Sequence, residues 1–249
     1  MNQNVERTIV LALTYVMVGT VVTGGGSIRA YEVTPATGGA IVSGRVTYVG
    51  ALPIAERLPV DRDKAFCGET MQDEALLVNE ESRGVAGVVI SLEGVAKGKP
   101  FPVDRALILE NRACRFLPRV GAVVAGSQLV ISNTDPVMHN THIRKKGRFG
   151  DNLLNVVQPL RGKVEKSLKE VGLLDVRCDA HPFMSATIHV FDHPYFAVTD
   201  EKGLFQLTQV PPGKYRLRMW HETLRKQEQT ITVPADGQVT INLEVGPGV

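Results

Sequence analysis

Short runs rich in β-branched residues recur along most of the chain, separated by turns built on Gly, Pro, Asn and Asp. Residues 40–50, 84–94, 123–133 and 186–191 are clear examples. Runs of this length between turn residues are typical of β-strands. Long amphipathic helix patterns are scarce. The pattern therefore predicts an all-β protein, and the 249 residues are enough for one large or two ordinary domains.

The same pattern continues toward the C-terminus, and two segments lack it. Residues 196–207 and 210–220 are predicted to form strands joined by Asp/Gly and Pro/Gly turns, and residues 229–243 to form a closing hairpin. Residues 54–84 are polar, and residues 144–163 are rich in Gly and basic side chains. We expect these two segments to be irregular.

The segment from Cys178 to Met184 places a thiol, an imidazole and a thioether within seven residues, with His181 between its ends. A second imidazole, His139, lies about forty residues upstream. One Cys, two His and one Met form the ligand set of a type 1 (blue) copper centre, in which a weak axial Met joins a trigonal His₂Cys plane. We predict one copper ion, bound by His139, Cys178, His181 and Met184. The alternative is a buried structural cysteine with histidines on the surface.

The other four histidines do not share this ligand pattern. His142 lies three residues beyond His139, so on a strand its side chain points to the opposite face, and we expect a structural or surface role. The remaining three, which have no partner at ligand spacing, are predicted to be ordinary strand or turn residues: His189, His193 and His221. None of the six histidines forms a His-x-His pair of the kind that multicopper oxidases need.

The chain has three cysteines, an odd number. In an oxidising compartment two of them can pair while the third does other work. Cys178 stands among potential metal ligands, so Cys67 and Cys114 are predicted to form a disulfide. Closing a loop of this length contributes ~4 kcal/mol in the chain-entropy model. The alternative is two free buried thiols.

The N-terminus has the pattern of an export signal. Arg7 precedes a mostly apolar run over residues 9–22, which at 14 residues is short for a membrane span of ~20 residues. Small residues follow over 24–30. We predict a signal peptide over residues 1–30, a periplasmic or secreted protein, and no membrane span in the mature chain; a buried strand or an uncleaved anchor are the alternatives. The net charge of +2 argues against a nucleic-acid partner.

The Cys178–Met184 segment, with residues 138–142 upstream, resembles the cupredoxin family of blue copper proteins. The two-residue gap between His181 and Met184 is more similar to amicyanin than to plastocyanin. The resemblance covers roughly residues 105–192 and implies a Greek-key β-sandwich there. It also implies that Asn140 braces the cysteine loop as a neighbour of the copper ligands.

Residues 199–205 and 210–215 resemble the carboxypeptidase-regulatory-like (transthyretin-like) β-sandwich, and residues 44–48 and 85–90 resemble its first strands. This implies one smaller sandwich formed by two separate parts of the chain, 40–104 and 195–246, with the cupredoxin domain of residues 105–192 inserted between them. The combination resembles exported proteins described as methylamine utilization protein-like, a description that says little about activity.

Together these features predict an electron carrier that is not an enzyme. The expected partner is a redox protein such as a cytochrome c or a dehydrogenase, docking at an exposed edge of His181. Basic side chains over residues 144–148 are placed to attract an acidic partner. Two alternatives stay open: a copper-binding carrier without a redox partner, and a binding module that uses the transthyretin-like sandwich to hold a glycan or a protein.

Overall fold

The fold is known from a computed structural model, which describes residues 31–34, 38–147, 150–159 and 162–247. Strands dominate these residues, and their one helix is the four-residue α1 (Lys64–Cys67). The predicted all-β class is confirmed. The predicted export signal, residues 1–30, lies outside the described residues. Within the part of the chain that is described, no helix is long and apolar enough to cross a membrane.

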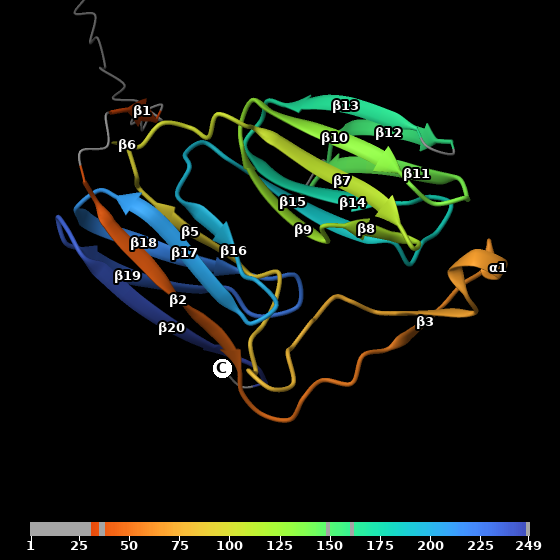
Figure 1. The fold of residues 1–249 in the computed structure, drawn as a ribbon, viewed down its shortest axis with the longest axis horizontal. Helices are drawn as coiled ribbons and strands as arrows, with labels where there is room; N and C mark the ends of the chain where they lie inside the picture. The colour runs from red at the N-terminus through yellow and green to blue at the C-terminus, as the bar shows by residue number, and fades with distance from the viewer. Residues whose placement is uncertain (1–30, 35–37, 148–149, 160–161, 248–249) are drawn as a thin grey trace, which may run out of the picture.

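The middle of the chain forms a two-sheet β-sandwich, here called the central sandwich (Figure 1). One sheet has the order β13-β10-β7-β8, and the other has the order β12-β11-β14-β15-β9. The strands of the first sheet are β7 (Ala106–Arg112), β8 (Arg115–Leu117), β10 (Ser127–Asn133) and β13 (Lys163–Leu168). Those of the second are β9 (Val120–Val124), β11 (His139–Lys145), β12 (Asn152–Gln158), β14 (Gly172–Arg177) and β15 (Ser185–Phe191).

Alternating burial along these strands creates the central core. In β10, Leu129 and Ile131 are fully buried while the residues between and beside them are more exposed. Val176 of β14 and Ile188 of β15 face the same core from the second sheet. Cys178 and Met184 belong to this core as well. The candidate ligand loop is therefore packed into the sandwich rather than attached to its surface.

A second sandwich, here called the discontinuous sandwich, combines strands from both ends of the chain. Its sheets have the orders β16-β5-β18-β19 and β17-β2-β20. The first contains β5 (Val89–Glu93), β16 (Phe196–Val198), β18 (Gly213–Trp220) and β19 (Gln227–Val233). The second contains β2 (Ala40–Tyr48), β17 (Leu204–Val210) and β20 (Gln238–Val245). A short parallel pair, β1 (Glu32–Val33) and β6 (Lys97–Gly98), lies outside both sandwiches.

Two expectations about local structure are wrong. The predicted hairpin over residues 229–243 does not form, because β19 pairs with β18 in one sheet while β20 pairs in parallel with β2 in the other. Turn residues between two strands predict where the chain reverses direction. They do not determine whether the two strands pair in one sheet. Both segments expected to be irregular contain ordered elements: residues 152–158 form β12 and pair with β11, and residues 57–72 contain two short strands and a helical turn.

Residues 57–72, here called the cover segment, contain β3 (Arg57–Pro59), α1 and β4 (Thr70–Gln72). The segment leaves the discontinuous sandwich after β2 and extends to the end of the central sandwich, at the right of Figure 1. The predicted disulfide is present: Cys67 of α1 is bonded to Cys114, in the turn between β7 and β8. Val60 and Cys67 are buried in the central core. The cover segment is therefore fixed to a sandwich that it does not belong to.

Side-chain contacts also join the two sandwiches. His189 of β15 packs edge-on against Trp220 of β18, with ring centroids 4.3 Å apart. Arg119 pairs with Glu222 through two contacts of 3.0 Å. Burial lowers the pKa of His189 and the pKa of His221 to about 4 in each case. Both histidines are therefore neutral in the folded protein at mildly acidic pH.

These two histidines predict a loss of stability in acid. Between pH 6.5 and 4 they bind protons when the chain unfolds but not while it is folded, so the free energy of unfolding falls as the pH falls through this window. A pKa difference of this size lowers the free energy of unfolding by at most about 3 kcal/mol per histidine. Urea unfolding across the window measures the slope. The double variant His189→Gln/His221→Gln should flatten it, and an unchanged slope would contradict this assignment.

Candidate metal centre

The Cys178–Met184 segment is the connection between two antiparallel neighbours, β14 and β15. Cys178 directly follows β14, and Met184 directly precedes β15. Two backbone hydrogen bonds close the loop: Met184 N–H donates to the carbonyl of His181 at 2.9 Å, and Cys178 N–H donates to the carbonyl of Met184 at 3.4 Å. The loop therefore has a fixed conformation that turns several of its side chains inward.

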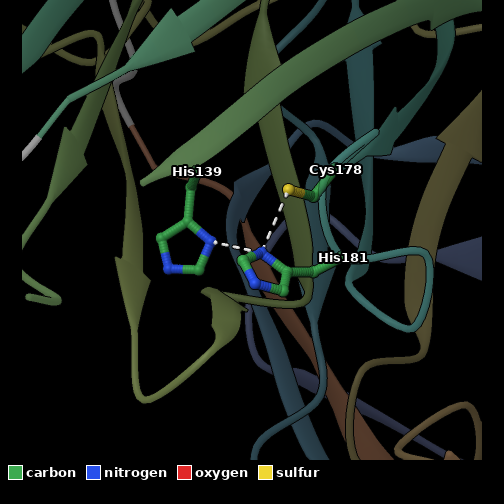
Figure 2. A group of neighbouring side chains, drawn as sticks. All are labelled: His139, Cys178 and His181. Carbon is green, nitrogen blue, oxygen red and sulfur yellow. Dashed lines mark hydrogen bonds between the residues drawn. The ribbon is translucent and has the colours of Figure 1, made fainter. Parts of the chain in front are cut away.

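His139 comes from the neighbouring strand. It is the first residue of β11, which pairs with β14 next to the loop. Figure 2 shows the three side chains converging, with His139 Nδ1 3.1 Å from His181 Nδ1, and Cys178 Sγ 3.7 Å from the same His181 nitrogen. These three ligand atoms all lie within 4.8 Å of one another. The structure thus brings together three of the four predicted ligands.

All the predicted ligands are shielded from water. The two histidines are fully buried, and Cys178 and Met184 are 1% and 2% exposed. Burial raises the pKa of the Cys178 thiol, an effect that the backbone N–H of Asn140 partly offsets by donating to the sulfur at 3.4 Å. Burial likewise lowers the pKa of His139. Both shifts favour neutral groups, so binding a cation would release the thiol proton.

Each imidazole is oriented by a carboxylate on its other nitrogen. His139 Nε2 lies 2.8 Å from Asp135 Oδ2, and His181 Nε2 lies 3.0 Å from Asp63 Oδ2. An ionised carboxylate only accepts hydrogen bonds, so each Nε2 must carry the proton, and both Nδ1 atoms are left with lone pairs. Two lone pairs 3.1 Å apart repel each other unless a proton or a metal ion lies between them. The donor set therefore fits a metal ion.

Asp135 is itself held by the backbone. Its carboxylate accepts hydrogen bonds from the N–H groups of Ala113 at 2.6 Å and Cys114 at 2.8 Å. Both of these residues have positive φ, at 51° and 56°, in the tight turn between β7 and β8. Although the Cys114 sulfur also lies near Asp135 and His139, it is consumed in the disulfide, so it is not available as a ligand.

Asn140 connects the two segments that carry the candidate ligands. Besides its backbone contact with Cys178, its side-chain oxygen accepts a hydrogen bond from the N–H of Asp179 at 3.1 Å. Its side-chain nitrogen donates to Asn155 at 2.6 Å. Asn155 in turn donates to the Asp179 carboxylate at 3.2 Å. This network ties β11, β12 and the ligand loop together.

His142 extends the network instead of joining the ligand cluster. Its Nδ1 lies 3.1 Å from Asp179, and its Nε2 accepts a hydrogen bond from Arg144 at 3.0 Å. The hydrogen bond with His142 is the main cause of the lowered pKa of Asp179. Arg144, expected to attract an acidic partner, is exposed and also contacts His142. The neighbouring Lys145 pairs with Glu170 at 2.7 Å.

One expectation about the site is wrong. The edge of His181 is not exposed, because the ring is fully buried and Asp63 of the cover segment occupies the position that solvent or a partner would take. Met138 beside the site is 49% exposed, and Pro182 is exposed too, so an apolar rim surrounds a covered centre.

Sequence reasoning did not identify the two carboxylates. Asp135 could have been found, since it lies four residues before His139 at the end of a strand that leads to the site. Asp63 could not, because it lies 118 residues from His181 in a polar segment without a recognisable pattern.

Comparison with known proteins gives one family match and several similar solved structures. Residues 177–246 match the family model of the carboxypeptidase regulatory-like domain. No curated protein matches the chain. Similar solved structures include an oxidised amicyanin mutant, at 21% identity, covering 35% of this chain and 84% of that one, with a TM-score of 0.31.

Two further solved structures are also similar to this chain. A purple cupredoxin from Nitrosopumilus maritimus is 23% identical, with coverage of 35% of this chain and 99% of that one and a TM-score of 0.29. A copper-containing nitrite reductase from Thermus scotoductus SA-01 is 17% identical, with coverage of 41% and 24% and a TM-score of 0.31. Because these scores are low, the function proposed below rests on the geometry of the site.

The contacts of Asp135 predict a stability effect. Asp135→Ala leaves two buried donors and one partly buried donor without an acceptor, so the free energy of unfolding should fall by about 3 kcal/mol or more. Urea unfolding of the metal-free protein measures this. Asp151→Ala, which removes an exposed carboxylate of the central sandwich, serves as the control and should change little. Equal stability of the two variants would contradict the bracing role.

Proposed function

We propose that the chain is an exported electron carrier with one type 1 copper ion, held by His139, Cys178, His181 and Met184. The observation that carries the proposal is the convergence of one buried thiol and two imidazole lone pairs. This donor set suits copper, and axial methionine is its usual fourth partner. When bound, copper supplies a couple that gains and loses one electron.

The residues around the site suit this task. His139 starts a strand, and Cys178 and His181 lie on a closed loop. Asn140 hydrogen-bonds to Cys178 and to the loop, and Asp135 accepts a hydrogen bond from His139. A site that is braced in this way keeps its geometry when the charge on the metal changes. Burial excludes water and other ligands, so a substrate has no direct access, and this supports a carrier over an enzyme.

The domain arrangement and the partner are part of the same proposal. We assign the copper site to a cupredoxin domain over residues 105–192, inserted in a carboxypeptidase-regulatory-like sandwich of residues 40–104 and 195–246. The separate sheets and separate cores of the two sandwiches support this division. The partner would be a redox protein such as a cytochrome c or a dehydrogenase, met in the periplasm or outside the cell.

A second candidate is a copper-binding carrier that does not exchange electrons. The burial of His181 beneath Asp63 favours it, because a covered ring is a poorer contact for a redox partner than an exposed one. Voltammetry of the copper-loaded protein separates the two functions. A reversible couple supports the electron carrier, and an irreversible one supports the copper carrier.

Addition of Cu(II) to the mature protein should produce an intense visible absorption band, because a copper–thiolate bond absorbs strongly. The variant Cys178→Ala should lose the band completely. His193→Gln changes a buried histidine outside the cluster, so it should retain the band and serves as the control. A wild-type protein that stays colourless with bound copper, or a band that survives in Cys178→Ala, would contradict the proposal.

A further inference from the structure

The cover segment contributes a group to the candidate copper site from outside the central sandwich. We infer that Asp63 is a positioning residue, which holds the His181 ring with Nδ1 toward the metal and closes the site to water. This inference rests on the proposed function and extends it. Its direct basis is the 3.0 Å contact between Asp63 Oδ2 and His181 Nε2.

The two side chains in this contact differ in their exposure to solvent. The His181 side chain is 0% exposed, while the Asp63 side chain is 35% exposed. Asp63 is therefore a boundary group, with one face on the ligand and the other on solvent. Without it the Nε2 edge of the ring would lose both its acceptor and its cover.

The local backbone holds Asp63 in this position. Asp63 has φ of 56°, in the left-handed region, and its carbonyl accepts hydrogen bonds of 2.9 Å from the N–H groups of Phe66 and Cys67. The strands on either side, β3 and β4, pair in an antiparallel hairpin. Lys64 and Glu69 form an ion pair at 2.9 Å across it. The hairpin is thus a defined unit, and Asp63 lies at the start of its helical turn.

The disulfide connects this unit to the other imidazole. Cys67 ends the helical turn that Asp63 begins, and it is bonded to Cys114. The N–H of Cys114 donates to Asp135, which contacts His139. The carboxylates that orient the two rings are therefore joined through one covalent cross-link. The cover segment is fixed to the site at its disulfide as well as at Asp63.

The position of the cover segment over His181 determines which surface a redox partner would contact. Because the His181 edge is covered, a docking protein would meet the cover segment and the exposed face of Asp63 in place of the ring. The surface that a partner would meet is charged in place of apolar, since Asp61, Arg62, Asp63 and Lys64 are all exposed there.

The test compares wild type with Asp63→Gly and Asp61→Gly. Glycine accepts positive φ without strain, so Asp63→Gly removes the carboxylate and retains the turn. Loss of a group that orients a metal-bound histidine weakens metal affinity by about 10- to 100-fold. We expect that loss for copper in Asp63→Gly, together with a higher midpoint potential. Asp61→Gly, which removes a neighbouring exposed carboxylate, should match wild type in both.

A second readout needs no metal. In the metal-free protein the His181 Nε2 proton should exchange slowly with solvent in nuclear magnetic resonance spectra, and quickly in Asp63→Gly. If wild type binds copper and Asp63→Gly matches it in affinity, potential and proton exchange, the role of Asp63 is overturned while the proposed function stands. If wild type does not bind copper, the proposed function fails, and the exchange rates alone decide whether Asp63 holds His181.

Discussion

The candidate site depends on one repeated interaction, the hydrogen bond from an imidazole Nε2 to a carboxylate. Asp135 accepts it from His139 and Asp63 accepts it from His181. Each bond fixes the tautomer of its ring, and together they leave two Nδ1 lone pairs facing each other beside the Cys178 sulfur. Such a grouping is unfavourable in an apolar core, and the copper ion proposed here would relieve it. Under the proposed function, metal binding and folding are therefore coupled at this point.

The scaffold makes this concentration of polar groups tolerable. Both sheets of the central sandwich contribute buried aliphatic side chains beneath the loop. Almost every polar group near the ligands has a hydrogen-bond partner, from Asn140 with Asp179 to Asp135 with the turn at Cys114. Buried polar groups cost free energy when they lack partners, so this network limits the penalty of the site. The disulfide then fixes the one part that comes from elsewhere in the chain.

Local patterns in the sequence predicted the features that depend on nearby residues. The strand class, the ligand loop and His139 follow from residue types and spacing, and the cysteine pair follows from excluding Cys178. Features that depend on distant pairing were not predictable. Neither the parallel pairing of β20 with β2 nor the contact of Asp63 with His181 produces a recognisable pattern in the local sequence. The expected exposure of His181 was wrong for that reason: what covers a side chain is decided by the whole fold.

Copper X-ray absorption spectroscopy of the mature protein, loaded with one equivalent of copper, tests the proposed site most directly. The fine structure reports the atoms bonded to the metal. The copper should show one short thiolate sulfur bond and two imidazole nitrogens, with no bound water. A first shell made only of nitrogen and oxygen, or one that contains a water molecule in wild type, would contradict a closed site built from Cys178, His139 and His181.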